Sequence, residues 1–227
     1  MTPEEMRANL ESELVWRQEE LAFFKNQLNN FEDDESKDKY RKSMVLMLYS
    51  HLEGFMKISL HIYIQYINSL NLERNKVNAN LVASSMHKEL NAYDNLDRKC
   101  KFFKRELPED KSLHHFYRRV DLLESIEEFK EKKIYIDDDT IDTESNLRYV
   151  ILQKNLFKVG LPVDLFCEYA SDIDALVNRR NSLAHGDRRA GVVQQEYENW
   201  ENKVYRIFSE INRLLYDYAV NARYLVR

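Results

Sequence analysis

Apolar residues recur every three or four positions along most of the chain, which is the spacing of amphipathic helices. The first such stretch runs from Thr2 to Asn30 and opens with Thr2-Pro3-Glu4-Glu5, residue types that begin helices. The longest runs from Lys37 to Leu70, and its wide apolar stripe predicts the centre of the core. A third runs from about Val193 to Tyr224. These stretches predict three long helices.

The middle of the chain repeats this periodicity in shorter pieces. We expect helices over Asn78–Arg105, Ser112–Lys132, Thr143–Val159 and Val163–Ala184. Only 4 Gly and 3 Pro occur in 227 residues, so the chain has few positions for sharp turns, which favours helices over many short strands. The sequence therefore predicts an all-α fold, a helical bundle with long antiparallel helices.

The length of 227 residues suits one sizeable domain, and we expect a single domain over residues 1–227. A helical and loop segment at about residues 106–142 is expected to be an insertion. It ends in the acidic run Asp137–Asp142, which lacks the Gly and terminal Glu of a calcium loop. We therefore predict an extended loop there and no metal site.

Charge and cysteine usage narrow the function classes. A net charge of −5 argues against coating nucleic acid through bulk electrostatics, so any RNA contact must be local. No apolar run approaches the ~20 residues of a membrane span, and we expect no membrane association. The two cysteines are isolated and the start has no apolar leader, so we expect a cytoplasmic protein. Cys167, among apolar residues, is expected to be a small buried side chain.

The residues Arg180, Asn181 and His185 form the pattern Arg-Asn-x-x-x-His at the predicted end of a helix, before Gly186. An Arg offers a forked cationic donor for phosphate oxygens, an Asn orients its neighbours, and a His exchanges a proton near neutral pH. Cleavage of a phosphodiester through the ribose 2′-hydroxyl needs such groups and no metal. We therefore expect these three residues to be catalytic, with no cofactor and no metal.

Positive charge gathers around this pattern. Between residues 179 and 189 the chain has four arginines against one acid, Asp187. We expect Arg179, Arg188 and Arg189 to bind RNA phosphates beside the catalytic residues.

The second predicted helix contains Glu53, at the edge of the apolar stripe, and His51 two residues before it. We expect Glu53 to pair with Arg180 and both second-helix residues to support the site; the alternative for Glu53 is an exposed helix carboxylate. A purely structural interpretation of the motif also stays open. In it, Arg180 and Glu53 join two helices and His185 caps a helix end.

One histidine per chain supplies either an acid or a base, whereas RNA cleavage profits from both. Two copies facing each other across a twofold axis would double the histidines around one phosphate. We therefore predict a homodimer.

Phe102 and Phe103 are flanked by Lys99, Lys101, Lys104 and Arg105. Cations with aromatics are typical of single-stranded nucleic-acid binding, but they also occur on ordinary amphipathic helices. We expect core aromatics with cations extending past them to solvent.

Three segments resemble HEPN-domain proteins, and in particular the bacterial MAE-type branch: Arg180-Asn181-x-x-x-His185-Gly186, Leu52-Glu53-Gly54-Phe55, and Ile141–Leu147 in matching order and spacing. The resemblance implies a HEPN-like helical bundle that dimerises around a composite cleft. It also implies metal-independent endoribonuclease activity, used in toxin–antitoxin systems, abortive infection or other antiviral defence. Arg180, Asn181 and His185 match the catalytic positions of the family, and Glu53 matches its supporting acid.

The resemblance therefore implies a toxin or antiviral-defence effector that cleaves RNA with His185 as general acid or base, with an antitoxin or another defence-system protein as a candidate partner. Asp187 departs from the pattern, because some family toxins carry there a tyrosine that a nucleotidyltransferase modifies. Some relatives are non-catalytic modules that bind nucleotide, RNA or protein, and this is the alternative function.

Overall fold

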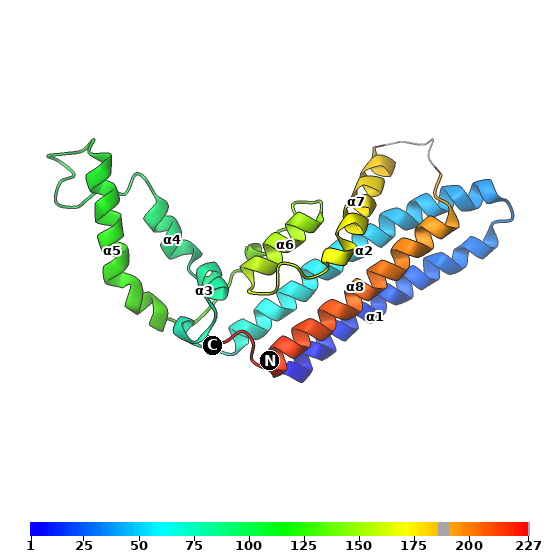
Figure 1. Cartoon of the computed structure of the whole chain (residues 1–227), viewed down its shortest axis with the longest axis horizontal. Helices are drawn as coiled ribbons and strands as arrows, with labels where there is room; N and C mark the ends of the chain where they lie inside the picture. The colour runs from blue at the N-terminus through cyan, green and yellow to red at the C-terminus, as the bar shows by residue number, and fades with distance from the viewer. Residues whose placement is uncertain (186–190, 227) are drawn as a thin grey trace.

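Helices make up the architecture of the chain, as Figure 1 shows. The structure is a computed structural model that describes residues 1–185 and 191–226. Its eight α-helices in these residues are α1 (Pro3–Gln27), α2 (Asp34–Ser69), α3 (Ala79–Ser85), α4 (His87–Asp94), α5 (Lys111–Glu131), α6 (Tyr149–Lys158), α7 (Ala170–Ala184) and α8 (Gln194–Val220). No strand joins them in this described part, so the predicted all-α class is confirmed.

Some predicted helix boundaries are wrong, for identifiable backbone reasons. The helix expected from Val163 begins only at Ala170, because Phe166 adopts the left-handed conformation with φ 65°. The helix expected from Thr143 begins at Tyr149, because Glu144 and Ser145 also have positive φ, 52° and 57°. The helix expected over 78–105 is two short helices that end at Asp94.

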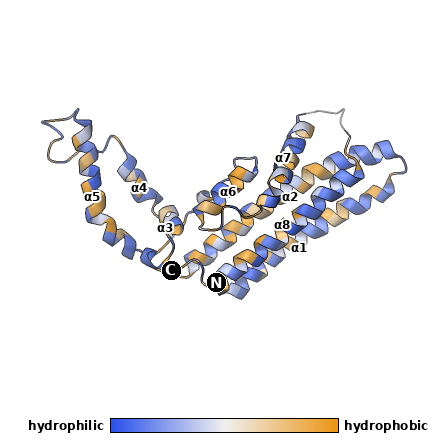
Figure 2. Ribbon diagram, in the orientation of Figure 1, coloured by the Kyte–Doolittle hydropathy of each residue, from blue (hydrophilic) through white to orange (hydrophobic). Residues whose placement is uncertain are grey.

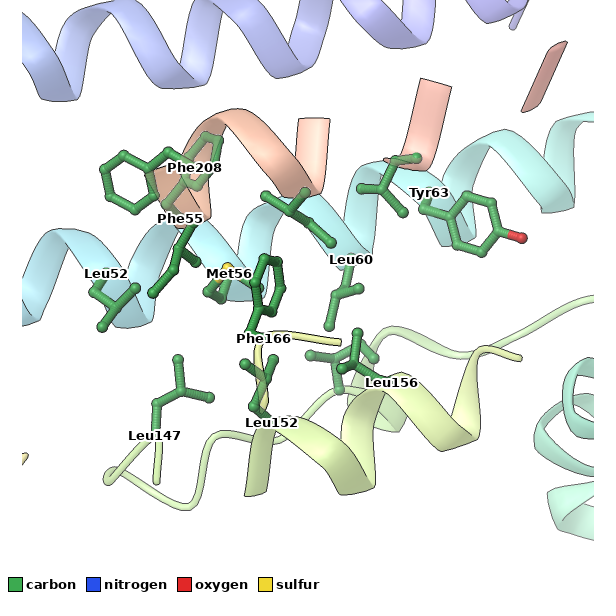
Figure 3. Packing of buried hydrophobic residues seen from close by; sticks show 14 of the residues in the cluster. Leu52, Phe55, Met56, Leu60, Tyr63, Leu147, Leu152, Leu156, Phe166 and Phe208 are labelled. Carbon is green, nitrogen blue, oxygen red and sulfur yellow. The ribbon is translucent and has the colours of Figure 1, made fainter. Parts of the chain in front are cut away.

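The bundle is built around α2, which packs against α1, α7 and α8. Hydrophilic residues cover the outer faces of these helices and apolar residues turn inward (Figure 2). Figure 3 shows the centre, where Phe55 of α2 meets Phe208 of α8 with ring centroids 4.4 Å apart. Leu152 and Leu156 of α6 close the other side of α2. α7 packs on α2 through its own buried residues Ile173, Leu176 and Val177.

A second part of the molecule, which we call the arm, consists of α4, residues 95–110 and α5, and it forms a V with the bundle (Figure 1). The buried Arg74 fixes its base by donating to Glu89 at 2.8 Å and to the Ser85 carbonyl at 2.6 Å. The arm overlaps the segment that we expected at residues 106–142 only over residues 106–131, because α5 ends at Glu131, and it begins earlier, with α4.

None of the described helices combines the length and apolarity needed to cross a bilayer. Cys167 is exposed, so the expectation that it is buried is wrong. It lies in a 3-10 turn ahead of α7 and not inside the helix that the sequence predicted.

Of two histidines on α2, His51 is buried and His61 is partly buried. His51 faces α1, with its Nε2 3.0 Å from Glu20 Oε2 and its ring 5.5 Å from that of Trp16. Burial lowers the pKa of His51, with the charge of Arg17 acting in the same direction and Glu20 opposing it. Burial also lowers the pKa of His61, which Asp138 partly offsets. Both imidazoles therefore resist protonation in the folded state.

These shifts predict that acidification destabilises the bundle. Below the ordinary histidine pKa of about 6.5, the unfolded chain binds protons that folded His51 and His61 resist, so the free energy of unfolding falls as pH falls through that value. Melting temperatures measured from pH 8 to pH 5 should decline less steeply in His51→Gln and His61→Gln than in wild type. The exposed His87→Gln variant serves as control. A wild-type slope in both the His51→Gln and the His61→Gln variant would contradict the prediction.

Candidate functional site

The motif residues lie at the C-terminal end of α7. Ile173, Leu176 and Val177 bury one face of this helix in the core, which leaves Arg180 and Asn181 partly exposed at its margin. His185 is the C-cap, with an exposed side chain, and its backbone N–H donates to the Asn181 carbonyl at 3.0 Å. One helix end therefore presents all three residues.

The guanidinium of Arg180 contacts three residues, two on α2 and one in the loop before α6. Its Nη2 donates to the Ser145 carbonyl at 2.9 Å and lies 4.0 Å from Glu53 Oε2. Its Cζ lies 4.1 Å from the centre of the Tyr49 ring, a cation–π contact. The side chain remains 21% exposed, and its buried Nε has no hydrogen-bond partner among the described residues. Arg180 is therefore oriented without being sealed from ligands.

Tyr49 of α2 contacts both Arg180 and the loop before α6. Its hydroxyl accepts a hydrogen bond from the buried Leu147 N–H at 2.7 Å, while its ring lies against Arg180. Burial raises the pKa of Tyr49, although the Leu147 N–H and Arg180 oppose the shift. Tyr49 therefore stays a neutral phenol and joins α2 to both the loop before α6 and the end of α7.

The loop before α6, residues 141–148, is fastened along α7. Asn181 Nδ2 donates to Asn146 Oδ1 at 3.1 Å. Arg148 Nη2 donates to Asn178 Oδ1 at 2.7 Å. These bonds, with that from Arg180 to Ser145, hold the loop against the motif. The sequence indicated this segment only through its order and spacing, and it gave no sign that Ser145 and Asn146 contact the motif.

Other expected site residues have different positions. Glu53 lies near Arg180, but at 4.0 Å their contact is loose. His51 points toward Glu20 on α1, because it lies on another side of α2 from Glu53, and we therefore do not place it in the site. Arg179 donates to the Gly191 carbonyl and lies 3.7 Å from Glu196, so it connects α7 to the start of α8. Arg188 and Arg189 are outside the described residues.

The polar groups of this site are suited to an anion that needs proton transfer. An exposed imidazole follows a partly exposed guanidinium by five residues on the same helix end. Among the residues that the structure describes, no three His, Cys, Asp or Glu side chains are grouped so as to hold a metal ion.

Comparison with known proteins finds one family model. The model described as HEPN_MAE_28990:/-like HEPN matches residues 6–224, nearly the whole chain. No curated protein and no solved structure matches.

The bond between Tyr49 and Leu147 generates a stability prediction. Tyr49→Phe leaves the Leu147 N–H buried without its acceptor, which costs ~1–3 kcal/mol of unfolding free energy. Denaturant unfolding measures the change. Tyr135→Phe is the control, because Tyr135 is 63% exposed and surface changes usually stay within ~0.5 kcal/mol. Equal stability of the two variants would contradict the role assigned to Tyr49.

Proposed function

Because the chain belongs to this HEPN family, we propose that it is an endoribonuclease that cuts RNA by 2′-hydroxyl attack, without a metal ion. One observation supports this most directly. The exposed imidazole of His185 ends the helix on which the Arg180 guanidinium is oriented while its side chain stays 21% exposed. A phosphate oxygen is a suitable acceptor for such a donor.

The proposed reaction is a transesterification. A base takes the proton of the ribose 2′-hydroxyl, and the 2′-oxygen attacks the adjacent phosphorus. The bond from phosphorus to the 5′-oxygen breaks, and an acid protonates that oxygen. The products are a 2′,3′-cyclic phosphate and a free 5′-hydroxyl. Histidine is suited to both proton transfers near neutral pH.

Arg180 would stabilise the negative charge that develops on the phosphate. Its guanidinium stacks on Tyr49 and bonds Ser145, so its orientation is set before RNA binds. Asn181 is bonded to Asn146, and we assign it the positioning of the helix end that carries His185.

We further propose that two chains form the active unit. Each chain offers one motif histidine, and the two proton transfers need a base and an acid. A twofold arrangement of the α7 ends would place two such histidines around one phosphate. Arg188 and Arg189 remain proposed RNA contacts of this dimer. In the cell we propose a toxin or antiviral-defence role, restrained by an antitoxin or another protein of the same system.

The central prediction is RNA cleavage in the presence of EDTA. Purified protein should cut single-stranded RNA, and His185→Ala should lower the rate about 100-fold or more because a general acid–base is lost. His87→Ala, at an exposed histidine of α4, is the matched control and should cut at the wild-type rate. Intact RNA with wild-type protein, or equal rates for His185→Ala, would contradict catalysis. If His185→Ala still binds RNA that wild type never cuts, the chain is a non-catalytic binding module.

A second prediction concerns the guanidinium. Arg180→Lys keeps the charge but loses the fork that reaches Ser145 and a phosphate together, so kcat/KM should fall about tenfold or more. Arg213→Lys, on the exposed side of α8, should leave it unchanged. The rate at which cleaved RNA appears on a gel, measured over a range of RNA concentrations, gives kcat/KM for both variants. Full activity in Arg180→Lys would show that charge alone suffices.

A further inference from the structure

The outer end of the arm carries a concentrated positive charge. Residues 98–105 read Arg-Lys-Cys-Lys-Phe-Phe-Lys-Arg, five cations without an acid in a chain of net charge −5. Arg98 pairs with Asp121 at 2.7 Å, and Lys99 lies 3.8 Å from Glu109. The other three, Lys101, Lys104 and Arg105, are exposed, and no ion pair to them is found in the part of the chain that the structure describes.

The aromatic residues between these cations point outward. Phe102 is 80% exposed and Phe103 is 43% exposed, so the expectation that they are core aromatics is wrong. The adjacent Cys100 is instead the buried residue of this segment. An exposed phenylalanine pair beside unpaired cations suggests a surface that has a partner.

The loop that presents them is anchored to α5 through buried groups. The N–H of Cys100 donates to Nδ1 of buried His114 at 3.1 Å, and Nε2 of the same ring lies 3.2 Å from the Pro108 carbonyl. His114 therefore bridges the two ends of the loop, accepting at Nδ1 and donating at Nε2. Because its ends are fixed, the loop can hold Phe102 and Phe103 away from α5.

Beside the loop lies a cavity of about 460 Å³, within the ~300–1,000 Å³ range of ligand sites. Lys99, Lys111 and Arg118 line it, with His114 and His115, against the carboxylates of Asp97 and Glu109.

Arg118 is the unusual residue of this cavity. It is only 4% exposed, its Nη1 donates to the Arg98 carbonyl at 3.3 Å, and its buried Nε has no partner among the described residues. No ion pair to it is found in those residues either. A buried cation without a counter-ion is costly, and an anionic ligand would remove that cost.

We propose that this arm tip, residues 96–111 with Arg118, binds single-stranded RNA, the substrate class on which the proposed function also rests. Phosphates contact Lys101, Lys104, Arg105 and the cavity at Arg118, and bases stack on Phe102 and Phe103. Stacking favours RNA over an acidic peptide, whose side chains present no flat aromatic face. In Figure 1 the arm tip and the C-terminal end of α7 lie on the same, open side of the V.

Binding of a fluorescein-labelled, single-stranded RNA of mixed sequence, measured by anisotropy, tests the proposal. The His185→Ala protein is used, so that RNA stays intact. Adding Phe102→Ala and Phe103→Ala to this protein should raise the Kd for RNA about fivefold or more, because stacking on the rings is lost. Phe23→Ala, at a 59% exposed residue of α1, is the matched control and should leave Kd unchanged.

Salt dependence identifies the phosphate contacts. Replacing Lys101, Lys104 and Arg105 by Gln should reduce the slope of log K against log salt by about 2, since each lost contact with a single strand contributes about 0.7. Replacing Lys130, Lys132 and Lys133 by Gln removes the same charge from the other end of α5 and should change the slope little. Arg118→Lys, which keeps the charge, should weaken binding if it folds as judged by circular dichroism.

The outcomes separate this proposal from catalysis. Wild-type protein that never cuts RNA, with binding that the tip variants weaken, supports the RNA site and removes only the proposed function. Cleavage and binding at wild-type levels in the tip variants overturn the RNA site and leave the proposed function standing. Polyglutamate that competes as well as RNA for the tip would also overturn it, in favour of an acidic protein partner.

Discussion

The contact on which the site depends is the stacking of Arg180 on Tyr49. The ring lies 4.1 Å below the guanidinium while the hydroxyl holds the Leu147 N–H at 2.7 Å. One side chain of α2 therefore fixes the loop before α6 and the end of α7 together. A partly buried cation needs such support, because desolvation without partners would be unfavourable. The support is also incomplete, since Glu53 is 4.0 Å away and Nε has no partner in the described residues. That combination leaves the guanidinium oriented and available to an anion.

The bundle around α2 is held by a large apolar core, whereas the arm extends away from it. Around α2, large side chains such as Phe55 and Phe208 are fully buried and join α2 to α8, while Ile173, Leu176 and Val177 bury one face of α7 in the same core. The arm has few core residues of its own and is held by single polar groups, Arg74 at its base and His114 at its tip. Buried polar groups of this kind specify geometry because each bond must be satisfied. The bundle thus positions the chemistry, and the arm places charge and aromatic surface at a distance from it.

Long periodic stretches were predictable from the sequence because their stripes are local. The helices expected over 2–30, 37–70 and 193–224 correspond to α1, α2 and α8 within a few residues. The all-α class followed from the same local information. The resemblance to the HEPN family rested on three short segments, one of which contains Arg180, Asn181 and His185, and the family match over residues 6–224 confirms it. Short segments were not predictable in this way. Positive φ at Glu144, Ser145 and Phe166 depends on contacts with other elements, and it moved the starts of α6 and α7.

The sequence by itself determined which residue types stand at one helix end, because Arg180, Asn181 and His185 lie within six residues of one another directly before Gly186, a residue type that commonly follows the end of a helix. Only the tertiary structure decided their partners. His51 and Glu53 are two residues apart, yet one faces α1 and the other lies near Arg180, since successive positions on α2 point in different directions. Phe102 and Phe103 have a core-like composition and are nevertheless exposed, because the buried position of their loop belongs to Cys100. Contacts between distant segments leave no periodic trace along the chain, and such contacts assign each side chain to core, site or surface.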